Sequence, residues 1–198
     1  MTELNQPLDD QLREIKRRLR AAMNGVLSGT MRKNGVDYRV NFGVDQHRLA
    51  EIASEIPHTY ELAAALWKED IRELRLLAIM TMPQSDFDEE LAMLWMEQLR
   101  YAEEAQVLVL HLLQYRPYAS SMAFRLIAAD AVMQRLVGWL LLGRLFMANL
   151  RPTQRDADER DLFFSLFPTR GAALGLFFGR SLDFHTGQFG VDHDAAAV

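Results

Sequence analysis

Residues 126–150 limit the choice of fold more than any other stretch, because they form the most apolar segment and yet carry two arginines. Apolar side chains over residues 136–146 cover most of a helix circumference, which is typical of a helix buried in a core. A membrane-spanning helix needs about 20 apolar residues in succession, and Arg144 interrupts this run. We therefore predict a core helix from Ala131, with Asp130 as its N-cap.

The composition is that of one globular domain. The chain has 198 residues, of which 49% are hydrophobic, enough for a sizeable core. A net charge of −5 neither supports nor excludes a nucleic-acid partner, because 22 Lys and Arg residues can still form a local basic face. The absence of cysteine excludes disulfides and thiolate chemistry. The N-terminal residues lack a secretory signal pattern, so we expect a cytoplasmic protein without a membrane partner.

Helical patterns alternate with short polar breaks along the chain. We predict a helix over residues 6–26, an ordered loop over 28–44 with a turn at Asn34-Gly35, and a helix capped by Asp45 and ended by Pro57. Further helices are predicted over residues 59–67, 70–82, 85–101, 105–115, 120–128, 131–150, 157–166 and 169–182. This pattern, which requires no strand, predicts an all-α, HEAT-like solenoid of stacked antiparallel helix pairs over residues 1–182, with a polar tail over 183–198.

Three segments resemble the DNA alkylation repair (AlkD-like) family of HEAT-like repeat proteins. The matching positions of the first segment are Gly43, Val44, Leu66, Trp67, Glu73, Arg75 and Ala78. The second segment is DAVMQRLVGWLL, in which Asp130 and Arg135 fall on polar positions of the family's pattern. The third, AALGLFFGRS at residues 172–181, resembles the family's terminal helix. Together these segments cover most of the chain.

This resemblance implies a concave surface that holds duplex DNA by its backbone. In catalytic members, aromatic side chains and an aspartate surround a cationic alkylpurine, and the aspartate stabilises the sugar cation that develops as the glycosidic bond breaks. Indole faces and a fixed carboxylate are suited to stabilise such charges. By the same resemblance, Arg135 is expected to contact the DNA backbone, which is a binding role rather than a catalytic one.

The residues at the catalytic positions differ from the family's pattern. With Trp95 on the first tryptophan of the family's WWD motif, the catalytic aspartate position falls on Arg100, and a shift by one places Leu99 there. Glu97 lies on the other acidic position and is the remaining catalytic candidate. Leu176 replaces the tryptophan of the terminal helix. We therefore predict a DNA-binding protein related to alkylpurine glycosylases, with an impaired or absent catalytic function.

The further candidate DNA contacts are Arg100, Trp95, Lys16 and Arg17. Lys16 and Arg17 lie on the basic side of the first predicted helix, which could equally be a solvated face. Trp95 occurs among Leu and Met at helical spacing, which favours a position in the core.

Arg135, Glu73 and Arg75 also have structural explanations. Arg135 can pair with Asp130 or Glu97, since buried charges are normally paired. Glu73 and Arg75 can form an ion pair or cap adjacent helices. These contacts would stabilise the repeats without binding a ligand.

No motif indicates a metal or a small-molecule cofactor. The His and Asp residues at 183–194 are suitable metal ligands, but their spacing matches no site that we can justify. Duplex DNA, with or without alkylated bases, is therefore the expected partner. Two alternatives stay open: an active N-glycosylase that removes alkylated purines with Glu97 as its anion, and a HEAT-like scaffold that binds a protein on its concave face.

Overall fold

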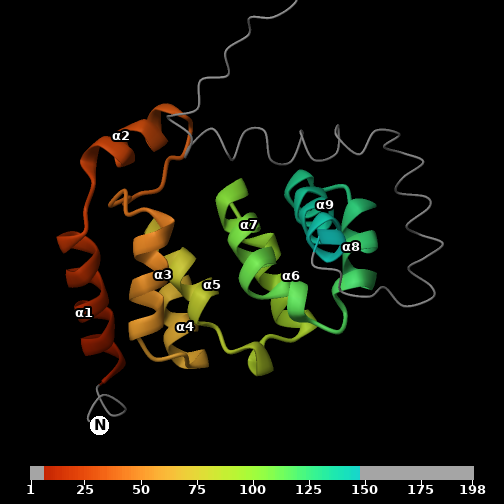
Figure 1. The fold of residues 1–198 in the computed structure, drawn as a ribbon, viewed down its shortest axis with the longest axis horizontal. Coiled ribbons are helices and arrows are strands. Elements are labelled where there is room, and N and C mark those ends of the chain that lie inside the picture. Colours follow the sequence, from red (N-terminus) through yellow and green to blue (C-terminus); the bar gives the residue numbers. More distant parts are fainter. Residues whose placement is uncertain (1–6, 148–198) are drawn as a thin grey trace, which may run out of the picture. The chain divides into compact units, whose positions relative to one another are not determined.

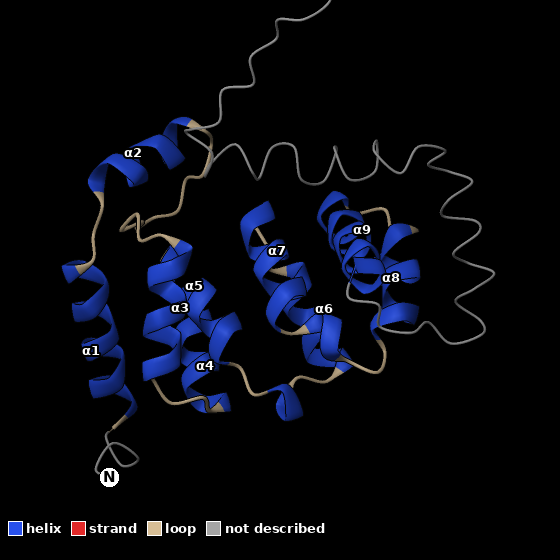
Figure 2. Ribbon diagram, in the orientation of Figure 1, coloured by secondary structure: helices blue, strands red, loops and turns tan. Residues whose placement is uncertain are grey.

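A computed structural model describes residues 7–147, and this part of the chain is all-α (Figures 1 and 2). Its helices are α1 (Leu8–Ala21), α2 (Gly25–Lys33), α3 (Gln46–Glu55), α4 (Tyr60–Trp67), α5 (Arg72–Thr81), α6 (Glu89–Glu97), α7 (Ala102–His111), α8 (Ala119–Ile127) and α9 (Val132–Met147), with 3-10 turns η1 (Gln84–Asp86) and η2 (Leu113–Tyr115). Over these residues, β-pairing is limited to one isolated bridge between Val40 and Ile71. The predicted all-α class is confirmed.

The helices stack in pairs around a continuous core. The row α3, α5, α7 and α9 packs side by side in that order, while α4 packs on α5 and α8 packs on α9 (Figure 1). Fully buried residues of this core include Leu62, Leu66, Leu74, Leu77 and Leu108. None of the helices within residues 7–147 is long and apolar enough to cross a membrane.

Polar contacts repeat at a spacing of about one helix pair. Hydrogen bonds join four residue pairs that are 31 positions apart: Phe42 and Glu73, Trp67 and Gln98, Arg72 and Glu103, and Phe87 and Tyr118. Three more pairs, Gly43 and Glu73, Asp70 and Arg100, and Gln114 and Arg144, are joined across 30 positions. Each helix pair is thus tied to the next by polar groups as well as by apolar packing.

Several predicted boundaries are wrong, mainly before residue 45. The first helix ends at residue 21, and α2 occupies residues 25–33, much of which was predicted as loop. The cause is Asn24, whose side chain accepts hydrogen bonds from two backbone N–H groups of the first turn of α2. The turn at Asn34-Gly35 is confirmed, since Gly35 has a φ of 85°. The Asp45 cap is also confirmed, whereas the helix predicted over 85–101 is divided into η1 and α6.

Helix α9 is less buried than predicted. Its buried residues are Val137, Gly138, Leu141 and Leu142. These residues form one face, while Val132 at the helix start is 73% exposed. The N–H of Arg135 donates to the carbonyl of Ala131, so Ala131 occupies the N-cap position that we predicted for Asp130. The predicted helices at 157–166 and 169–182 and the polar tail lie outside the described residues.

Gly138 allows α9 to approach α8 closely. A Cβ atom at this position would lie 2.7 Å from the backbone nitrogen of Ile127 and 2.9 Å from the carbonyl oxygen of Ala123.

We expect Gly138→Ala to lower the free energy of unfolding by about 1–3 kcal/mol, because the two helices must move apart. Gly143→Ala in the same helix is the control, since its Cβ would meet no atom of residues 7–147 within 4 Å. It should stabilise the protein by about 0.5–1 kcal/mol. Urea denaturation followed by circular dichroism measures the free energy of unfolding of both variants. Equal changes of this free energy in the two variants would contradict the prediction.

Candidate nucleic-acid interface

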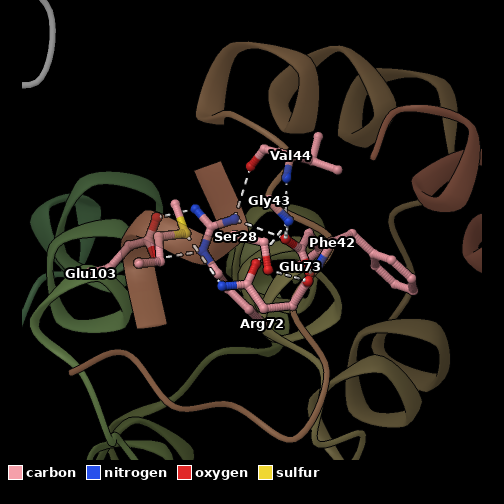
Figure 3. Close-up of polar contacts among 9 residues, drawn as sticks. Ser28, Phe42, Gly43, Val44, Arg72, Glu73 and Glu103 are labelled. Carbon is pink, nitrogen blue, oxygen red and sulfur yellow. Dashed lines mark hydrogen bonds and ion pairs between the residues drawn. The ribbon is translucent and has the colours of Figure 1, made fainter. Parts of the chain in front are cut away.

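A buried carboxylate on α5 fixes the loop that precedes α3 (Figure 3). Glu73 is fully buried, and it accepts hydrogen bonds from the backbone N–H groups of Phe42, Gly43 and Val44 at 3.1, 3.0 and 3.3 Å. Arg72 donates to the same carboxylate at 2.9 Å and to the carbonyl of Val44 at 2.8 Å. These donors offset the cost of burying the charge. Glu73 therefore shapes the loop and does not face a ligand.

A related arrangement lies one repeat further along. Arg72 is buried and donates through Nε at 2.8 Å to Glu103 on α7. Arg75 forms an ion pair with the fully buried Glu104, which also accepts the backbone N–H of Arg100 at 2.8 Å. The carboxylate on α7 thus holds the loop before its own helix, as the one on α5 holds the loop before α3. Glu73 and Arg75 are structural residues, although they do not pair with each other.

Trp95, a predicted DNA contact, lies in the core. It is 3% exposed, and its ring stacks on Trp67 with 4.2 Å between centroids and an angle of 3° between planes. Phe87 meets Trp95 edge-on at 5.3 Å, and the guanidinium of Arg75 lies 3.9 Å from the centroid of the Trp67 ring. The rings of Trp67 and Trp95 are therefore used in packing contacts within the core. As the core interpretation of Trp95 indicated, its ring is not open to a base.

Glu97 and Arg100 lie on the surface near the end of α6. Both are exposed, and Arg100 forms an ion pair with Asp70. Residues two positions apart point to different sides of a helix, so Glu97 points away from the buried Trp95. The predicted catalytic and aromatic candidates therefore do not come together around one site. The terminal segment with Leu176 lies outside the described residues.

Arg135 connects α9 to the preceding turn. Its Nη1 donates to the backbone carbonyls of Ala129 and Asp130 at 3.0 and 2.6 Å. Arg135 therefore does not form the ion pair with Asp130 or Glu97 that we considered from the sequence as its structural role. Within residues 7–147, no partner is found for its Nε or Nη2. The guanidinium is half-exposed and held at one nitrogen, so its other N–H groups can donate to phosphate.

The predicted basic contacts on α1 are largely paired with acids. Lys16 Nζ lies 2.9 Å from Glu69. Arg17 and Arg18 both bind Glu14, and these hydrogen bonds lower the pKa of Glu14 to about 2. The acid therefore stays charged near neutral pH and continues to pair with both arginines. Lys16 and Arg17 are correspondingly less available to phosphate than an unpaired cation would be.

Unpaired cations instead follow on residues 20–39, a segment that we call the basic corner. Its cations are Arg20, Arg32, Lys33 and Arg39. All four are exposed, and within residues 7–147 none of them forms an ion pair. Asp37 is the sole acidic residue of this segment. We did not single out Arg32, Lys33 or Arg39 from the sequence, although the excess of basic over acidic side chains in MRKNGVDYR was a usable signal.

No metal centre is formed in the described part of the chain. Among residues 7–147, no group of three or more His, Asp and Glu side chains is arranged to hold a metal ion. The His and Asp residues at 183–194 lie outside the described range.

Comparison with known proteins identifies both the fold and the family. A solved structure described as "a new family of proteins related to the HEAT-like repeat DNA glycosylases with affinity for branched DNA structures" matches with a TM-score of 0.60 and 19% identity. The match covers 66% of this chain and 55% of that chain, so this chain spans little more than half of that protein's length. The stacked helices are thus those of a HEAT-like repeat protein.

The family model for DNA alkylation repair enzymes matches residues 15–140, and the chain belongs to this family. No curated protein sequence matches it.

Proposed function

We propose that the chain binds DNA through the sugar-phosphate backbone and does not excise alkylated purines. The observation that carries this proposal is the basic corner, a segment with one acid and four exposed cations, for which residues 7–147 provide no ion-pair partner. The whole chain has a net charge of −5, so this local excess of positive charge is not a consequence of overall composition. Phosphate contacts by such cations release counterions and so stabilise binding.

Two further observations support DNA as the partner. The Nε and Nη2 groups of Arg135 have no acceptor among residues 7–147, and the planar N–H donors of a guanidinium are suited to phosphate. The solved structure with the same fold is described as having affinity for branched DNA structures. Both observations are consistent with a surface that contacts the sugar-phosphate backbone of DNA.

The lack of excision follows from where the candidate catalytic groups lie. A cationic alkylpurine requires an aromatic face and a carboxylate on the same side of a cavity. Here Trp95 is covered by Trp67, and Glu97 points away from it. We therefore expect no free base from duplexes that contain methylated purines. Base release that is lost in Glu97→Gln would contradict this proposal and favour an active glycosylase.

Salt dependence tests the proposed phosphate contacts. If the four cations of the basic corner each contact one phosphate, raising the salt from about 50 to 200 mM should weaken duplex binding about 100-fold. Fluorescence anisotropy with a labelled duplex measures the dissociation constant. In the double variant Arg32→Ser and Lys33→Ser, the slope of log K against log salt should become shallower by about two.

A matched control separates this effect from a general loss of charge. Arg48→Ser removes an exposed cation on α3 that is paired with Glu51, and it should leave the salt slope unchanged. If the wild-type chain at micromolar concentration fails to bind a duplex at the lower salt concentration, the proposed function is wrong. It is equally wrong if the double variant and the control behave alike.

A further inference from the structure

Among the helices of residues 7–147, α2 buries the fewest side chains. Ser28 is its single buried residue, whereas α5, of similar length, is buried along nearly its whole length. Val26 is 82% exposed, and Leu27 and Met31 are half-buried. Most of the stability of a helix in a protein comes from the packing of its apolar face. Helix α2 therefore receives little stability from packing.

The sequence of α2 also disfavours an isolated helix. The helix has nine residues, and isolated helices shorter than about 12 residues are marginal in water. Gly29 lies in its middle, where glycine favours the unfolded chain relative to alanine. Val26 and Thr30 are β-branched, and such residues lose side-chain freedom in a helix. The helical conformation of α2 therefore depends on its anchoring contacts.

A few polar contacts provide this anchoring. The Asn24 side chain accepts hydrogen bonds from two backbone N–H groups of the first turn of α2. The backbone N–H of Asn24 donates to the carbonyl of Phe42 at 2.9 Å, and Ser28 Oγ donates to the carbonyl of Asn41 at 2.8 Å. Each hydrogen bond makes a small net contribution to stability. The docking of α2 on the loop at residues 41–42 is thus held by a small total free energy.

Docking of α2 completes the basic corner. Arg20 lies in the last turn of α1, which packs on α4. Arg39 lies next to the backbone bridge that ties its segment to the start of α5. Arg32 and Lys33, in contrast, lie in the last turn of α2. Two of the four cations therefore keep their positions only while α2 is docked.

On this basis, and resting on the proposed function, we infer that α2 opens and docks as a unit of its own and that DNA binding is coupled to its docking. The docked form presents all four cations to the phosphates, whereas the open form releases Arg32 and Lys33. DNA binds the docked form more tightly and so shifts α2 towards docking. A change that weakens docking lowers the affinity for DNA even when every cation is kept.

Hydrogen exchange of the full chain without DNA tests the separate opening of α2. After correction for intrinsic rates, the backbone amides of α2 should exchange at least about 100-fold faster than those of α5, because local opening exposes them without global unfolding. Gly138→Ala, which destabilises the packing of α9 on α8, should speed the exchange of α5 and leave that of α2 unchanged. Exchange of α2 and α5 at a common rate overturns the inference, whatever the result with DNA.

Variants of the anchoring contacts test the coupling to DNA by fluorescence anisotropy with a labelled duplex. Ser28→Ala should lower duplex affinity about threefold to tenfold, because the buried carbonyl of Asn41 loses its donor in the docked form. Adding Gly29→Ala to this variant should recover most of the affinity, since alanine favours the helix about fivefold over glycine. The added Cβ would meet no atom of residues 7–147 within 4 Å.

Thr30→Ala is the matched control. The hydroxyl of Thr30 donates within α2 to the carbonyl of Val26 at 3.0 Å, so its removal does not affect docking on the loop. Duplex affinity should stay within about twofold of the wild type. Unchanged exchange of α5 in Ser28→Ala shows that the rest of the fold is intact.

The outcomes separate the inference from the proposed function. If Ser28→Ala and Thr30→Ala bind the duplex equally well, or if Gly29→Ala gives no recovery, the coupling is wrong and the proposed function stands. Exchange of α2 that the duplex does not slow also contradicts the coupling. If the wild type binds no duplex at micromolar concentration, the proposed function and the coupling fail together, whereas the separate opening of α2 is decided by hydrogen exchange alone.

Discussion

Glu73→Ala should lower the free energy of unfolding by about 3–5 kcal/mol, because it removes one partner of a buried charged network. The substitution would leave the buried Arg72 without one of its acceptors and the N–H groups of Phe42, Gly43 and Val44 without theirs. Chemical denaturation followed by circular dichroism measures the change. The loop before α3 should also exchange its backbone amide hydrogens faster.

Two companion variants make this prediction specific. Glu73→Gln keeps an oxygen acceptor but not the charge, so its effect should be smaller than that of the alanine variant. Glu97→Ala removes an exposed carboxylate for which no ion pair is found within residues 7–147, and its stability should stay within about 0.5 kcal/mol of the wild type. Equal stability losses in Glu73→Ala and Glu97→Ala would show that the buried network does not hold the loop.

Gly43→Ala should have the second large effect, a loss of about 3 kcal/mol. Gly43 has a φ of 71°, and an L-residue in this conformation costs about 1–2 kcal/mol. The added Cβ would also lie 2.2 Å from the carbonyl oxygen of Asn24 and 2.7 Å from the backbone nitrogen of Ser28. Relieving this overlap by shifting the backbone costs about 1–3 kcal/mol more.

Gly35→Ala is the matched control for this substitution. Gly35 also has a positive φ, of 85°, but its Cβ would meet no atom of the described residues within 4 Å. Its cost should therefore be limited to the backbone conformation, about 1–2 kcal/mol. Thermal unfolding of both variants separates the two contributions. A Gly43→Ala variant with wild-type stability would contradict this close approach of Gly43 to the start of α2.

The helical class was predictable because helix signals are local. Asp45 stands immediately before an amphipathic stretch, and its side chain caps α3 as expected. Asn24 offers the same chemistry before α2, but the glycines at 25 and 29 and the short stretch between them obscured the signal. The family resemblance was confirmed by the family model that matches residues 15–140. It was recognisable because each helix pair needs an apolar face that its neighbours cover, and this requirement leaves short motifs.

The partners of the buried charges were not predictable from local pattern. Arg72 and Glu103 are 31 positions apart, and their contact depends on how two helix pairs stack. Arg135 donates to backbone carbonyls. Such acceptors cannot be predicted from the positions of acidic residues in the sequence. Trp95 was assigned two roles, and only its stacking on Trp67 shows that the ring is covered. The proposed site contains the basic corner in place of Lys16 and Arg17, because their pairing with acids could not be read from charge alone.

The hydrogen bonds across 31 positions also limit how this array can change in length. Helical-repeat proteins can gain or lose whole units when each unit packs on its neighbour through a general apolar face. Here, deletion of the pair that contains α7 would leave the guanidinium groups of Arg72 and Arg75 without the carboxylates of Glu103 and Glu104. A unit could be exchanged only for one that carries acids at the same two places. The buried ion pairs therefore determine which helix pair can follow another in the array.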